Sequence, residues 1–325
     1  MVNVTRFLAA VQTLLGVGVL FGVTPVHAQE LPDPVRIIVP FSAGGTLDAT
    51  ARLLADSLRA VTGRNHLVEN RPGAAGTIAA SDVAKAKPDG SMLLYTTGGH
   101  TTNAVLYSRL PFDPITDFTP ITQLSVSAGF VLLVASTSPY KTAQDLIAAA
   151  RAQPGKLTYG SAGNGNTTHL VGALFARAAG LDMVHVPYKA SPLNDLMGGH
   201  IDLTFLSASL ARPLLQQGKL RALAISGGQR AADLPEAPTF AELGIEGVDV
   251  PAWSGILGPR GMTAATAAMI QRDIAAATAK PEFQAAMLKF GSTAVVSTPA
   301  EFAAYIRTEV QRYKKQLPPL GIRMD

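Results

Sequence analysis

The sequence contains two glycine-rich turns whose residue types are suited to holding a small anion. The first, at Gly44-Gly45, follows an apolar, β-branched run at 35–39 and precedes Leu47, Leu54 and Leu58 at helical spacing. A strand that turns directly into a helix leaves backbone N–H groups unpaired at the positive end of that helix, where proteins bind anions. We therefore expect residues 42–46 to present N–H groups to one anionic group of a ligand.

The second turn, GSAGNGNTTH at 160–169, repeats the design of a strand, a glycine-rich loop and a helix. It lacks the lysine of a phosphate-binding loop, and Thr168 stands where a dinucleotide fingerprint has its third glycine, so a nucleotide is not expected. What remains is a helix start rich in N–H and O–H donors, with a simple tight turn as the open alternative. Its candidate ligand-binding residues are Ser161, Gly163, Asn164, Gly165, Asn166 and Thr167.

Three further residues have both a functional and a structural interpretation. Asp48, in the first turn of the expected helix, is either an acid placed favourably against the helix dipole or an acceptor that orders a ligand through a water, which we favour. Lys189 either pairs with an anion or, as lysines usually do, lies solvated. Thr97 follows a strand predicted at 92–95, at the carboxyl edge where open α/β sheets bind ligands.

No catalytic constellation accompanies these turns. The sequence has no Gly-x-Ser-x-Gly or His-Glu-x-x-His motif, and its six histidines are scattered. The absence of cysteine excludes thiolate chemistry and sulfur-rich metal sites, so we expect no metal and no cofactor. The net charge of +4, without a run of lysines or arginines, argues against nucleic acid as a partner.

The first 28 residues are predicted to be a cleaved signal peptide. Arg6 precedes an apolar stretch from 7 to 23, and Val26-His27-Ala28 forms a cleavage site of the small-x-small type. The alternative is a retained membrane anchor, but the stretch is short against the roughly 20 residues that a span needs. We expect an exported protein that folds without disulfides and starts at Gln29.

The remaining chain alternates apolar strands with amphipathic helices, which predicts an α/β fold with mostly parallel sheets. Strands are expected at 67–70, 92–95, 130–136, 183–186, 201–206 and 220–226. The block from Trp253 onward is expected to be mostly helical. Its last helix opens with Thr298 as N-cap, Pro299 at the first position and Glu301 placed for a capping box.

Seven blocks of this sequence resemble, in order, the extracytoplasmic solute receptors of tripartite tricarboxylate transporters, also called Bug-type receptors. They include VRIIVPFSAGGTLDATARLLADSL, VENRPGAAGTIAASDVAKAKPDG, PGKLTYGSAGNGNTTHL and HVPYK. The resemblance implies a two-lobed periplasmic binding protein of the Venus-flytrap, type II-like kind. Each lobe would be a mostly parallel sheet flanked by helices, with residues 29–126 and 251–325 in one lobe and 127–250 in the other.

The resemblance also implies a carboxylate held by both turns, which assigns ligand binding to Phe41, Ser42, Ala43, Gly44, Gly45 and Asp48 and to the second-turn residues above. It implies a monomer that binds a small organic acid and delivers it to a permease of one large and one small multi-span protein. The loop YKASPLNDL at 188–196 is about two residues shorter than is usual in the family, next to the expected cleft. Asn166 stands where relatives usually have serine.

Two other functions remain open at this point. A sensory protein that presents its ligand to a membrane kinase would have the same sequence features, and neighbouring reading frames would distinguish it from a transport receptor. A hydrolase or isomerase on the same scaffold is disfavoured by the missing catalytic constellation. The bound acid itself, whether a di- or tricarboxylate or an aromatic acid, is not predicted.

Overall fold

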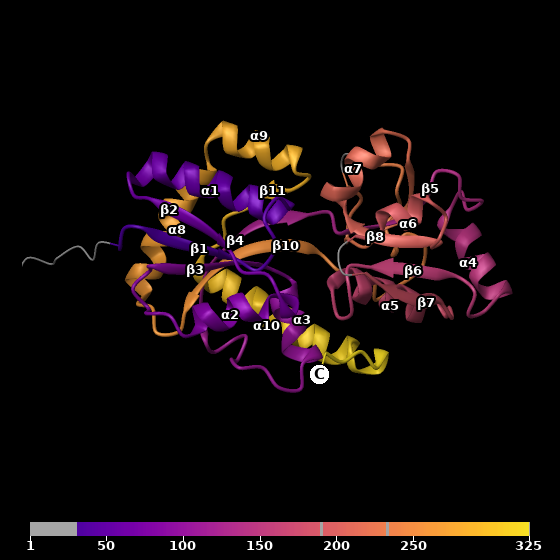
Figure 1. The fold of residues 1–325 in the computed structure, drawn as a ribbon, viewed down its shortest axis with the longest axis horizontal. Coiled ribbons are helices and arrows are strands. Elements are labelled where there is room, and N and C mark those ends of the chain that lie inside the picture. Colours follow the sequence, from indigo (N-terminus) through magenta and orange to yellow (C-terminus); the bar gives the residue numbers. More distant parts are fainter. Residues whose placement is uncertain (1–30, 189–190, 232–233, 325) are drawn as a thin grey trace, which may run out of the picture. The chain divides into compact units, whose positions relative to one another are not determined.

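The computed structural model describes residues 31–188, 191–231 and 234–324 of the 325-residue chain. The predicted signal peptide and Lys189 lie outside the described residues. The described chain forms two β-sheets, each flanked by helices (Figure 1).

The first sheet has six strands in the order β11-β4-β10-β3-β1-β2. Its strands come from both ends of the described chain, because β10 and β11 return to it after the second sheet is complete. The strands are β1 (Val35–Val39), β2 (His66–Asn70), β3 (Met92–Thr97), β4 (Phe118–Ser127), β10 (Ala252–Pro259) and β11 (Thr293–Ala294). The helices that accompany them are α1 (Thr46–Thr62), η1 (Ala74–Gly76), α2 (Thr77–Ala84), α3 (Gly99–Leu106), α8 (Ala264–Thr278), α9 (Pro281–Lys289), α10 (Pro299–Gln316) and η2 (Pro318–Leu320).

The second sheet has five strands in the order β7-β6-β8-β5-β9, all from one continuous stretch of chain. They are β5 (Phe130–Ala135), β6 (Thr158–Ser161), β7 (Val184–Pro187), β8 (Leu203–Ser207) and β9 (Leu220–Ile225). The helices of this stretch are α4 (Ala143–Ala152), α5 (Thr167–Ala179), α6 (Leu193–Met197) and α7 (Ala208–Gln216).

As expected, most strands of each sheet point the same way: four of the six in the first sheet and four of the five in the second. In the first sheet β1 pairs in parallel with β2 and β3, but β10 runs antiparallel to both β3 and β4, and β11 runs antiparallel to β4. In the second sheet β5 runs antiparallel to both of its neighbours. The βαβ units produce the parallel pairs, whereas the antiparallel pairs arise where the chain leaves one sheet for the other and returns.

The alternation of apolar residues along each central strand builds two cores on each sheet. In β1, Val35, Ile37 and Val39 pack with α1, α8 and α9 on one face. Ile38 packs with α2 and α10 on the other, and Figure 1 shows these two groups of helices on opposite sides. In β5, Leu132 and Val134 face the core of α4 and α5, while Val131 and Leu133 face α6 and α7. Both central strands are therefore buried on both faces.

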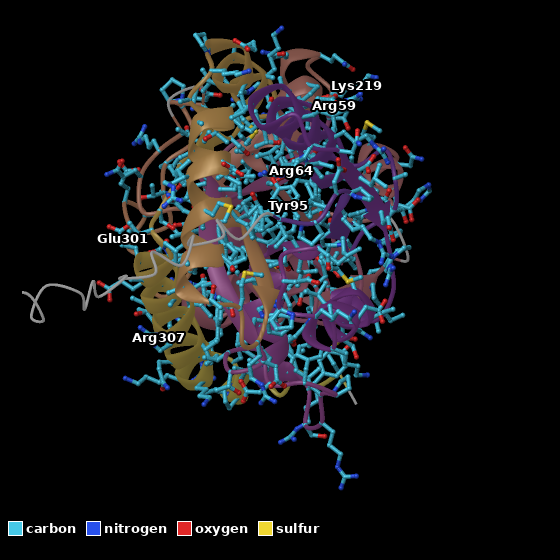
Figure 2. All side chains as sticks on the ribbon, turned by 90° about the vertical axis from the view of Figure 1, so that its left-hand side faces the viewer. Arg59, Arg64, Tyr95, Lys219, Glu301 and Arg307 are labelled. Carbon is cyan, nitrogen blue, oxygen red and sulfur yellow. The ribbon has the colours of Figure 1, made fainter. Side chains whose placement is uncertain are left out.

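The helix ends follow the sequence signals. Thr298 caps α10 with its side chain, and the Glu301 carboxylate accepts from the Thr298 backbone N–H at 2.7 Å, which completes the predicted capping box. Figure 2 labels Glu301 and Arg307 along this helix and Tyr95 among the side chains in the middle of the view.

Two glycines allow close packing where the chain passes between the sheets. Gly129 joins β4 to β5 with φ +109°, and a Cβ there would lie 2.7 Å from the backbone nitrogen of Gly227. A Cβ on Gly227 would lie 1.9 Å from the carbonyl oxygen of Ala128. The outgoing and returning segments thus touch backbone to backbone, and a side chain at either position would separate them.

We expect Gly227→Ala to lower the free energy of unfolding by about 1 to 3 kcal/mol, because its methyl group meets backbone that has no room to move. Gly228→Ala is the matched control, since its Cβ would meet only Asp249 Oδ2, at 3.9 Å. Urea unfolding of both variants measures the difference. Equal stabilities would show that the two crossing segments separate without cost.

Candidate anion-binding site

The first turn joins β1 to α1 and depends on one of its two glycines. Gly44 has φ +87°, a conformation that residues with a side chain rarely adopt. Gly45 is the N-cap of α1 with an ordinary extended conformation, φ −80° and ψ 169°, and a Cβ there would meet only Ser42 O, at 3.8 Å. The glycine requirement of the turn therefore lies at Gly44.

Asp48 braces this turn from within α1. Its carboxylate, in a residue only 4 % exposed, accepts from the backbone N–H of Gly44 at 2.9 Å, from Arg52 Nε at 3.1 Å and from Asn70 Nδ2 at 3.0 Å. The bond from Arg52 is the main reason why the pKa of Asp48 falls to about 2, and the Gly44 bond adds to it. Asn70 also donates to the carbonyl of Phe41, at 3.0 Å. These bonds give Asp48 a structural role in shaping the turn.

The start of α1 keeps unpaired donors. No described residue accepts a hydrogen bond from the backbone N–H groups of Gly45, Thr46 and Leu47, because the first turn of a helix has no internal acceptors for them. Residues 41–45 are exposed, and Thr46 and Leu47 line a cavity of about 140 Å³. The positive end of a 17-residue helix thus opens on this cavity.

The lining of this cavity is neutral and rich in hydroxyl groups. Among the described residues that line it there is no charged side chain. Leu47, Ala252 and Trp253 supply its apolar part. Its hydroxyls belong to Thr46, Thr50, Tyr95, Thr97, Ser125, Ser127, Ser207, Ser254 and Ser292. A larger cavity of about 610 Å³, lined in part by Arg212 and Arg230, adjoins it, since Ser127 and Ser292 line both.

Strand register explains why the hydroxyls gather here. Ser254 of β10 lies opposite Ser125 of β4 on one side and opposite Thr97 of β3 on the other. Ser127 follows Ser125 by two residues, and side chains two apart on a strand share a face. Three neighbouring strands therefore present one row of small polar side chains at the sheet edge next to the start of α1.

Four of these hydroxyls form a connected buried chain. Ser125 Oγ lies 2.6 Å from Ser254 Oγ, which lies 3.0 Å from the Tyr95 hydroxyl. Tyr95 donates to Thr50 Oγ1 at 3.1 Å, and Thr50 donates to the carbonyls of Thr46 and Leu47, both at 3.0 Å. Burial raises the pKa of Tyr95, so it stays a neutral phenol. The chain connects the sheet edge to the first turn of α1.

The second turn is held by bonds among its own residues. Ser161 Oγ lies 2.7 Å from His185 Nε2 and donates to the Gly163 carbonyl at 3.1 Å. Asn166 is the N-cap of α5 and accepts from the Thr168 backbone N–H at 3.0 Å. The backbone N–H groups of Asn164 and Thr167 have no acceptor among the described residues. Two donors of this turn thus remain for a ligand.

The C-terminal residues pack on the second turn. A Cβ on Gly165 would lie 2.2 Å from Met324 Sδ, so the Met324 side chain covers this glycine. The Met324 backbone N–H donates to the carbonyl of Leu106 at 3.0 Å, and Arg177 of α5 donates to the carbonyl of Pro319 at 3.2 Å. The residues after α10 therefore contact both α3 and α5.

Two histidines support the second turn from beneath. The rings of His169 and His185 stack with centroids 3.7 Å apart and parallel planes. His169 Nδ1 accepts from the Gly165 backbone N–H at 3.1 Å, which requires this nitrogen to be unprotonated. Burial lowers the pKa of His169 to about 4, with a smaller effect from His185. The turn therefore depends on a neutral imidazole.

We expect this histidine to make stability fall with acidity. Its pKa is near 6.5 in the unfolded chain, so between pH 6.5 and about 4 the unfolded state binds a proton that the native state does not. The free energy of unfolding is highest above pH 6.5 and loses about 2 kcal/mol from this residue by pH 5. His169→Asn keeps an acceptor near Gly165 but cannot titrate.

Denaturant unfolding across this pH range measures the effect. The slope of stability against pH should be smaller by nearly one proton in His169→Asn than in the natural protein. Identical slopes would show that His169 takes up its proton without opening the turn.

The structure brings together only part of the predicted site. Thr97 lines the cavity at the start of α1, close to the first turn. None of the second-turn residues is among the residues that line this cavity. Within the second turn, Ser161 is fully buried and its hydroxyl is used internally. Lys189 lies outside the described residues.

Sequence reasoning missed the hydroxyl row. Ser125, Ser127 and Ser254 lie on β4 and β10, two strands that were not predicted. The alternation Ser-Val-Ser at 125–127 is the signal that would have placed two of them on one face. Thr50 and Tyr95 lie inside predicted elements, where a core role is the usual interpretation.

The described residues hold no group of three or more histidine, cysteine or acidic side chains that would bind a metal ion. Among the helices of the described part of the chain, none has the length and apolar character needed to cross a bilayer.

Two sheets, each flanked by helices, give this chain the fold of periplasmic binding proteins. Residues 50–322 match the family model of the tripartite tricarboxylate transporter family receptor. The chain belongs to this family, whose members are solute receptors and not enzymes.

Three similar proteins support this assignment. Protein BugT of Bordetella pertussis is 30% identical over 330 residues, which cover 99% of each chain. A Rhodopseudomonas palustris protein, solved with adipate, is 33% identical with a TM-score of 0.81 over 89% of this chain and 97% of its own. MatC from the same species, solved with bound malate, is 28% identical with a TM-score of 0.78 over 86% and 97%.

Proposed function

We propose that this protein is a periplasmic receptor that captures a small organic carboxylate with the N-terminus of α1. One observation carries the proposal: unpaired N–H groups at the start of a long helix open on a cavity lined by hydroxyls and by no charged side chain. Such a site stabilises an anion by backbone donors and the helix dipole together. The adipate and malate in two related structures support a carboxylate as ligand.

The receptor would deliver its ligand to a permease of one large and one small multi-span membrane protein. Membership of a transporter receptor family supports this role. The second turn would complete the site when the two sheets approach each other around the ligand, with 29–126 and 251–325 as one lobe and 127–250 as the other. Ligand contacts on both sides of a cleft would shift such an equilibrium toward the closed form.

Gly44→Ala tests the anion site. The alanine would force the turn out of its left-handed conformation at a cost of about 1 to 2 kcal/mol and displace the N–H groups that follow. We expect a loss of affinity of about tenfold or more for any carboxylate found by a thermal-shift screen of organic acids, measured by calorimetry. Gly45→Ala is the control, because its backbone conformation accepts a side chain.

The ligand provides a second control. Replacing its carboxylate by a carboxamide removes the charge at nearly constant shape, so the amide should bind far more weakly than the acid. Amides that bind as well as acids, or a folded Gly44→Ala variant with full affinity, would place the anion site elsewhere.

Export gives an independent prediction. We expect the protein isolated from the periplasm to begin at Gln29, with no lipid attached, because the sequence has no cysteine to carry one. Its intact mass measures this directly. A full-length or acylated protein would mean that the first 28 residues are a membrane anchor.

A further inference from the structure

The buried hydroxyl chain beside α1 has only one possible direction. Thr50 donates to the carbonyls of Thr46 and Leu47, which cannot donate in return, so its single hydrogen is used. Thr50 must therefore accept from Tyr95, whose own single hydrogen is used in this bond. The next two bonds follow from the same rule.

Ser254 must donate to Tyr95, because the hydrogen of Tyr95 is already given to Thr50. The hydrogen of Ser254 is then used as well, so in the short contact of 2.6 Å it is Ser125 that donates to Ser254. Every hydroxyl in the chain donates its hydrogen to the neighbour nearer to α1. The last oxygen, Ser125 Oγ, is left with unused lone pairs and no hydrogen to offer.

Ser125 ends the chain at the cavity. The residue is 6 % exposed and lines the cavity, and no described residue donates to its oxygen. Ser127 Oγ lies on the same face of β4, is buried, and has no hydrogen-bond partner among the described residues. A buried polar oxygen without a hydrogen-bond partner is costly, so the molecule that fills the cavity has to form hydrogen bonds with these two oxygens.

We infer that the ligand carries a hydroxyl group in addition to the carboxylate held by α1, and that this hydroxyl donates to Ser125 Oγ. The inference rests on the proposed function and narrows it to hydroxy acids, with Ser125 as the residue that determines specificity. An acid without the hydroxyl leaves the Ser125 oxygen unsatisfied when it displaces water from the cavity.

An ammonium group would also donate to Ser125, but the cavity does not suit it. No acidic side chain is among the described residues that line it. Asp48, the nearest acid of the first turn, already accepts from Gly44, Arg52 and Asn70 and is neutralised by Arg52. An amino acid would therefore bury a positive charge without a counter-charge, whereas a neutral hydroxyl carries no such cost.

The test compares acids that differ in a single group. Malate, succinate and aspartate share one four-carbon skeleton with a hydroxyl, a hydrogen or an ammonium group at the same carbon, and citrate and tricarballylate form a second pair with and without the hydroxyl. Calorimetry with the natural protein should show malate binding about tenfold or more tightly than succinate and aspartate, or citrate preferred over tricarballylate by a similar factor.

Three variants locate the origin of the preference. Ser125→Ala should reduce it to about twofold or less, chiefly through weaker binding of the hydroxylated acid. Ser125→Thr keeps the oxygen and should keep the preference. Ser57→Ala, which removes a buried hydroxyl of α1 that does not line the cavity, should keep it as well. Circular dichroism and thermal unfolding confirm that each variant is folded.

The outcomes separate this inference from the proposed function. Equal binding within each pair, a preference for the unsubstituted or amino acid, or a preference that survives Ser125→Ala overturns the inference while the receptor function stands. Binding only of acids outside both pairs, none of them hydroxylated, overturns it too. If no organic acid binds, the proposed function fails and the inference fails with it.

Discussion

The antiparallel ladder between β4 and β10 is the constraint on which the other features of this protein depend. It runs from Phe118 opposite Pro259 to Ser127 opposite Ala252 and joins the early part of the chain to the part that returns from the second sheet. The same ladder fixes where the chain crosses between the sheets, because β5 begins three residues after β4 ends. It also sets the register that puts Ser125 beside Ser254.

The βαβ parts of the fold were predictable because their signals are local. Apolar alternation identified β1, and the capping box at Thr298 identified the start of α10. β10 was missed because Gly255 and Gly258 weaken the strand pattern. Tertiary packing requires glycine at both positions. A Cβ on Gly255 would lie 2.3 Å from Phe302 Cζ, and one on Gly258 would lie 2.4 Å from Met262 Cε. Packing between distant segments leaves no local pattern to read.

The candidate site likewise has a part that was predictable from local sequence and a part that was not. The first turn was predictable because a strand, a glycine pair and a helix follow one another along the chain. The structural role of Asp48 in bracing this turn was not predictable from the sequence, because its partner Asn70 lies 22 residues away along the chain. The row of hydroxyls depends on the register between strands that are distant in the sequence. That register cannot be predicted from the individual residues.

The hydroxyl chain ends on the carbonyls of Thr46 and Leu47 in the first turn of α1. The unpaired N–H groups of Gly45, Thr46 and Leu47 belong to the same turn. A ligand held at α1 by its carboxylate and at Ser125 by its hydroxyl would close a ring of hydrogen bonds that all point the same way around. Each bond in such a ring polarises the next. The carboxylate and the hydroxyl of the ligand would then bind cooperatively, so their contributions to the free energy of binding would not be additive.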